Sequence, residues 1–113
     1  MIIDAGEKVH IIERRYFPED LRRHFIGVVT RCTENAIRVR GRVWVFDGAK
    51  GQFVRKPEER DRVISLCNRL NINVIPPEVI LDEIAYVITP QKGLVVTDGK
   101  KFSLDVTEFT AMR

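Results

Sequence analysis

Residues 25–47 read FIGVVTRCTENAIRVRGRVWVFD, and from Ala36 onward aliphatic side chains alternate with polar or aromatic ones. Successive side chains of a β-strand point to opposite faces of a sheet, so a period of two residues indicates a strand with two different faces. One face is aliphatic, and the other combines arginine with aromatic residues. The first consists of Ile37, Val39, Val43 and Val45, and the second of Arg38, Arg40, Arg42, Trp44 and Phe46.

Gly41 interrupts this long segment near its middle. A glycine inside a strand often marks a bulge or a sharp bend. In a small barrel, such a bend would let one long strand pair on both sides of the fold. We therefore predict that the segment bends at Gly41 and remains a strand on either side.

Shorter segments of strand character flank this one and are separated by turn-forming residues. We predict strands at 8–14 and 24–32, and a third strand that begins at 36 and ends at a turn over 47–51. Further strands are predicted at 52–56, 62–67 and 71–75. Several short strands at intervals of about 8–12 residues are typical of a small barrel or sandwich. We predict a mainly β fold, a small and strongly bent β-barrel of about five strands over residues 8–75.

Residues 15–23 connect the first two strands and leave two alternatives open. Pro18, two following acids and the arginines at 22–23 have the charge order of a short helical turn. A connection of this length is equally consistent with an irregular loop.

The pair Pro76-Pro77 marks the end of the predicted barrel. We predict one domain over residues 1–113, in which residues 76–113 form an extension of the barrel. A proline at the first helical position favours a short helix over Glu78–Ile84, although β-branched Val79 and Ile80 would also suit a strand. Further on, Asp98-Gly99 predicts a β-hairpin with a type I′ turn. The strand before the turn contains Leu94 and Val96, and the strand after it contains Phe102, Leu104 and Val106. A third strand is predicted at 86–88.

Composition limits the class of protein. The chain has 113 residues with 44% hydrophobic and 31% charged residues, which suits one globular domain. No stretch approaches the roughly 20 apolar residues of a membrane span, and no signal peptide is recognisable. We expect Cys32 and Cys67 to be reduced thiols of a cytoplasmic protein. Residues 1–56 carry 12 Lys and Arg against 7 Asp and Glu, which favours an anionic partner for this half.

No catalytic signature is present: the sequence lacks a glycine-rich phosphate loop, a nucleophile elbow and an HExxH motif. His10, His24, Cys32 and Cys67 do not have the spacing of zinc ligands. We therefore expect neither an enzyme nor a bound metal or other cofactor.

The run Phe25-Ile26-Gly27-Val28-Val29, followed by Asn35 and the alternation at 37–39, resembles the first motif of Sm-like proteins. The resemblance implies a small, strongly bent barrel that assembles into rings and binds single-stranded RNA. Asn35 is the residue that would stand in for the base-reading turn of that family, although the turn here is shorter. Residues 8–75 would also suit another SH3-like barrel, and the segments at 53–60, 97–100 and 104–106 resemble small bacterial proteins of unassigned function.

Two hypotheses follow. The first is a binding module that contacts single-stranded RNA or another anion through Arg38, Arg40, Arg42, Trp44 and Asn35, with Trp44 as a stacking platform. Tryptophan is more often buried, so Trp44 could instead cover the end of the barrel or fill an interface. The second hypothesis is a structural protein that forms a homo-oligomer through its barrel, because small barrels have edge strands able to pair with a neighbour.

Overall fold

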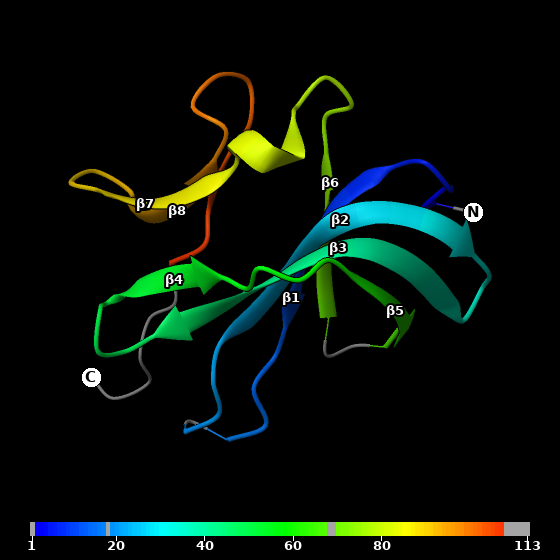
Figure 1. Cartoon of the computed structure of the whole chain (residues 1–113), viewed down its shortest axis with the longest axis horizontal. Helices are drawn as coiled ribbons and strands as arrows, with labels where there is room; N and C mark the ends of the chain where they lie inside the picture. The colour runs from blue at the N-terminus through cyan, green and yellow to red at the C-terminus, as the bar shows by residue number, and fades with distance from the viewer. Residues whose placement is uncertain (1, 18, 68–69, 108–113) are drawn as a thin grey trace. The chain divides into compact units, whose positions relative to one another are not determined.

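The computed structural model describes residues 2–17, 19–67 and 70–107 (Figure 1). It is mainly β, as predicted, and the chain divides into two compact units, Met1–Pro77 and Glu78–Arg113. The first unit contains the strands β1 Lys8–Glu13, β2 Arg23–Cys32, β3 Ala36–Asp47, β4 Gln52–Arg55, β5 Arg60–Ser65 and β6 Leu70–Ile75. The second contains η1 Leu81–Glu83, β7 Ala85–Thr89, β8 Gly93–Thr97 and β9 Ser103–Asp105.

The first unit is an antiparallel sheet in the order β4-β3-β2-β1-β6, with β5 also paired to β3. Figure 1 shows β2 and β3 as long, curved neighbouring strands. β3 pairs with β5 through residues 36–41 and with β4 through residues 44–47. Its change of partner falls at Gly41, so the prediction that one long strand pairs on both sides of Gly41 is confirmed.

The predicted barrel is wrong in its closure, because no closed barrel forms in the described part of the chain. β4 and β5 both pair with β3, while β6 pairs with β1, so the sheet keeps separate ends. Pro57 lies between β4 and β5 and has no N–H to donate to a ladder. The segment therefore forms two short strands, as predicted at 52–56 and 62–67, and with all six predicted segments formed the unit has one strand more than the barrel of about five.

The core lies on the face that the alternation predicted to be aliphatic. Ile37, Val39 and Val43 of β3 are buried, and Val45 is partly buried against the same cluster. Arg38 and Arg40, on the opposite parity, are exposed. The remaining buried members of the cluster come from β1 and β2. They are Val9 and Ile11 of β1, and Phe25 and Val29 of β2.

The connection between β1 and β2 is a loop in its described residues, so the second of the two alternatives is correct. The Asp20 carboxylate accepts the backbone N–H groups of Tyr16 and Phe17, at 3.1 Å each. These hydrogen bonds give two backbone N–H groups of the loop an acceptor without a helical turn. Within the described residues, no helix has both the length and the apolar character needed to cross a membrane.

The predicted helix over Glu78–Ile84 is wrong. Only the 3-10 turn Leu81–Glu83 forms, and Ile80 and Ile84 on either side of it have extended backbone angles. Val79 and Ile84 are both buried. Residues five apart lie on different sides of an α-helix, so a helix would have exposed one of these side chains. Burial of both side chains favours the extended conformation, which β-branched residues also prefer.

The second unit is the three-stranded antiparallel sheet β7-β8-β9, which includes the predicted hairpin and the predicted third strand. The turn is not type I′, because Gly99 has φ +79° but no non-glycine residue of the described chain has positive φ. Instead, Asp98 Oδ1 accepts the N–H groups of Lys100, Lys101 and Phe102 in a longer loop. These hydrogen bonds, with that from Phe102 first, lower the pKa of Asp98.

Gly27 and Gly41 lie opposite each other in the β2–β3 ladder, and neither position has room for a side chain. A β-carbon on Gly41 would overlap the carbonyl oxygen of Ile26, and one on Gly27 would overlap that of Arg40. In a regular sheet, side chains stand away from the neighbouring backbone. These overlaps show that the backbones of β2 and β3 come unusually close where both strands bend.

Gly41→Ala is expected to destabilise the protein by about 3 kcal/mol, because the new methyl group must displace backbone and not a flexible side chain. Gly48→Ala is the matched control, since a β-carbon there would meet nothing within 4 Å and should change stability by less than about 0.5 kcal/mol. Urea unfolding of the two variants measures both values. Equal midpoints would contradict a close contact at Gly41.

Candidate nucleic-acid interface

Two of the three arginines that were predicted to form one binding face have partners within the protein. Arg40 makes ion pairs with Glu59 and with Asp61, at 2.9 Å each. The guanidinium of Arg42 donates a hydrogen bond to the carbonyl oxygen of Pro57. Both side chains are thus engaged by the segment around β5, and the charge of Arg40 is compensated by two carboxylates.

Trp44 and Asn35 lie at different places. Trp44 is half-buried and lies opposite His24 in the β2–β3 ladder. It is six residues from Arg38 along β3, or about 20 Å in an extended strand. Asn35 is exposed in the turn between β2 and β3, next to the other end of the strand. The five predicted residues therefore do not converge on one site.

Arg38 instead lies beside an arginine that was not predicted to take part. A register shift after Val29 places Arg31 of β2 directly opposite Arg38 of β3. Both residues are exposed. Within the part of the chain that the structure describes, neither guanidinium makes an ion pair or a hydrogen bond. We call Arg31 and Arg38 the arginine pair.

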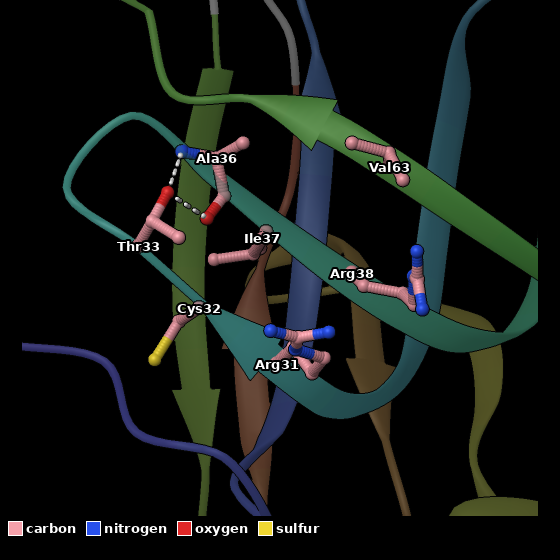
Figure 2. Close-up of a pocket in the computed structure, with 7 residues that line it drawn as sticks. All are labelled: Arg31, Cys32, Thr33, Ala36, Ile37, Arg38 and Val63. Atoms are coloured by element: carbon pink, nitrogen blue, oxygen red, sulfur yellow. Dashed lines mark hydrogen bonds between the residues drawn. The ribbon is translucent and has the colours of Figure 1, made fainter.

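The arginine pair lines an open hollow of about 160 Å³ near the β2–β3 turn (Figure 2). Thr33 holds this turn: its hydroxyl oxygen accepts the N–H groups of Asn35 and Ala36. The exposed side chain of Val63 on β5 lies opposite Arg38. No carboxylate is among the described residues that line the hollow, which are Arg31, Cys32, Thr33, Ala36, Ile37, Arg38 and Val63.

The size of the hollow restricts what it can hold. Sites that enclose a small-molecule ligand usually have volumes of about 300–1,000 Å³. The hollow beside the arginine pair is smaller, at about 160 Å³, and it is open to solvent. It suits one anionic group of a larger partner better than a whole metabolite.

A second basic hollow, of about 210 Å³, lies at the other end of β2. It is lined by three arginines and Tyr16, but also by the carboxylates of Glu13 and Asp20. These acids compensate part of the positive charge. The arginine pair is therefore the stronger candidate for binding an anion.

The predicted turn does not identify Arg31. Hairpin register follows from the turn, and a turn at Thr33-Glu34-Asn35, centred on Glu34, would pair Cys32 with Ala36 and Arg31 with Ile37. The observed register differs by one residue and pairs Cys32 with Ile37 and Arg31 with Arg38. The alternation pattern alone drew attention to β3 and left its partner strand aside.

The two histidines also come together in the structure, although the sequence shows no link between them. His10 and His24 are buried, and their ring nitrogens are 3.0 Å apart. Among the described residues, no three His, Cys, Asp or Glu side chains gather closely enough to hold a metal ion.

In comparisons with known proteins, no family model, no curated protein and no solved structure matches this chain. The resemblance of residues 25–39 to Sm-like proteins therefore stays a prediction. No relative assigns a ligand or an activity to the chain, and the arginine pair is the feature on which its function can be argued.

Proposed function

We propose that this protein is a non-enzymatic binding module whose arginine pair contacts the phosphates of single-stranded RNA or of another polyanion. The observation that carries the proposal is the contrast between neighbouring arginines. Arg40 has two carboxylate partners at 2.9 Å, whereas Arg31 and Arg38 have none among the described residues and lie in a hollow without a carboxylate.

The physical chemistry of guanidinium groups supports an anionic ligand. Like charges placed directly opposite each other destabilise a pair of strands. A phosphate between Arg31 and Arg38 would remove this repulsion, and guanidinium groups bind phosphate through two parallel hydrogen bonds. Release of counterions from the nucleic acid adds to the affinity at low salt.

The proposed contacts are with the backbone of the nucleic acid. Trp44 does not line the hollow and lies six residues from Arg38, beyond the bend at Gly41, so we do not expect it to stack a base held at the arginine pair. Phosphate contacts position a nucleic acid without reading its sequence. We therefore expect little preference among bases. The proposal includes a cytoplasmic location, because Cys32 and Cys67 are free thiols.

Replacing both arginines with glutamine is expected to weaken RNA binding at least tenfold at low salt. Two lost phosphate contacts should also lower the slope of log affinity against log salt by about 1.4, the value for two contacts to a single strand. Fluorescence anisotropy with labelled oligouridylate and oligoadenylate of equal length measures both quantities. The two oligomers should bind within a few-fold of each other.

The matched control is the double variant Arg14→Gln/Arg23→Gln. It removes the same charge from the second basic hollow, where both arginines are exposed. It should bind RNA nearly as well as the wild type. Equal losses in the two double variants would indicate a general effect of net charge, and no binding by the wild type would refute the proposal for RNA.

A second candidate function is self-association through the open ends of the sheet. β5 and β6 each pair with a single strand, and each presents an exposed valine: Val63 is 67% exposed and Val74 is 51% exposed. Edge strands with apolar side chains are able to pair with another chain. A homo-oligomer built in this way would be a structural or interaction protein.

Light scattering coupled to size-exclusion chromatography distinguishes this candidate. If the protein self-associates through β5 and β6, the wild type should elute as an oligomer, and Val63→Lys/Val74→Lys should shift it toward a monomer. A wild type that is monomeric at about 100 μM would rule out a stable homo-oligomer.

A further inference from the structure

A chain of hydrogen bonds between side chains crosses three strands of the first unit. The Asn73 side-chain amide nitrogen on β6 is 3.2 Å from His10 Nδ1 on β1. His10 Nε2 is in turn 3.0 Å from His24 Nδ1 on β2. His10 is 0% exposed and His24 is 1% exposed. We call His10 and His24 the imidazole pair.

These contacts determine where the protons lie. An amide nitrogen only donates, so His10 Nδ1 accepts from Asn73 and must carry no proton. The proton of His10 is then on Nε2, from which it is donated to His24 Nδ1. His24 therefore carries its own proton on Nε2. Both rings are neutral, and both have the same tautomer.

An additional proton on either ring opposes this arrangement. A proton on His10 Nδ1 would face the donating amide of Asn73, and a proton on His24 Nδ1 would face the N–H of His10. Each case replaces a donor and acceptor by two donors in a buried site. The side-chain hydrogen bond between β6 and β1 is lost in the first case, and the one between β1 and β2 in the second.

The surroundings of the imidazole pair also disfavour positive charge. Burial lowers the pKa of His10 to about 4. Burial, followed by the charges of His10 and Arg22, lowers the pKa of His24 to about 3. Arg22 lies over the rings of Phe46 and Phe53, each 5.1 Å away, and the ring of Phe53 is 4.5 Å from that of His24.

Strand register identifies the other charged residues that share this face near the imidazole pair. Lys8 is two residues from His10 on β1, Arg42 lies opposite Ile26, and Arg55 lies opposite Trp44. All three are cationic, and β6 contributes Asn71 and Asn73 to the face. The nearest acids of this face are Asp61 of β5 and Glu59 just before that strand, and both are already paired with Arg40. No carboxylate of these strands is placed to stabilise a protonated imidazole.

We propose that the imidazole pair makes the attachment of β6 acid-sensitive, so that mild acidification opens the β1–β6 edge of the sheet. Of the three strands joined by these side-chain contacts, β6 opens most readily, because β1 is its single partner in the described sheet, whereas β1 and β2 each have two partners. Leu70 and Ile72 of β6 pack against the core cluster. Opening therefore uncovers the free edge of β1 and part of the core.

The direction of the effect follows from linkage. The open form has ordinary histidines and binds protons more tightly than the closed form. Closure is therefore strongest above about pH 6.5 and weakens as the pH falls from there toward 4, the pKa of His10 in the closed form. For one histidine, the equilibrium for opening rises about 30-fold between pH 7.5 and pH 5.

Hydrogen exchange of the β1 and β6 amides in the full chain tests the proposal. After correction for the intrinsic exchange rate, their protection is expected to fall about 30-fold between pH 7.5 and pH 5. Amides shared by β3 and β5 should lose less. Protection of β1 and β6 that stays constant over this range would overturn the proposal.

Asn73→Asp supplies a carboxylate that accepts a proton from His10 Nδ1, so this variant is expected to lose the acid-sensitive opening. Gln52→Glu adds the same charge at an exposed position of β4, which pairs with neither β1 nor β6, and should behave like the wild type. If Asn73→Asp does not fold, nitrogen-15 spectra of the wild-type imidazoles still decide the matter. Both rings should remain neutral Nε2–H tautomers at pH 6, and a ring that titrates near pH 6.5 would refute the proposal.

Discussion

Gly27 and Gly41 meet backbone to backbone where β2 and β3 bend, and the arrangement of the first unit depends on that contact. Because neither residue carries a side chain, the two strands approach more closely than other residues would allow. β3 then pairs with β5 before the bend and with β4 after it. The bend thus divides β3 into one half that pairs with β5 and another half that pairs with β4.

The bend also separates two kinds of polar chemistry. On the half that pairs with β5, the arginine pair lies at the hairpin end and has no carboxylate partner in the described part of the chain, whereas Arg40 nearer the bend has two. On the other half, β2 places His24 opposite Trp44, in a buried region where imidazoles remain neutral. One exposed region thus suits an anion, while the buried region disfavours added positive charge.

Local rules predicted the strands and their faces, whereas long-range pairing determined the rest. The alternation on either side of Gly41 depends only on the period of a strand, and the buried and exposed positions follow it. A turn centred on Glu34 would have paired Arg31 with Ile37, so the pairing of Arg31 with Arg38 was not indicated by the sequence. His10 and Asn73 are 63 residues apart in the sequence, and no local pattern indicates their contact either. Closure of the barrel and the helix after the two prolines were predicted wrongly because strand pairing and burial overrode local signals.

The central structural claim is that β3 pairs with two different strands on the two sides of its bend. Nuclear Overhauser contacts between backbone protons of opposite residues test it most directly. The account predicts contacts from Arg38 to Val63 and from Phe46 to Phe53 in the same sample. If either set is absent while the other is observed, β3 pairs with only one strand besides β2, and absence of the Arg38–Val63 contact would also contradict the placement of the arginine pair beside β5.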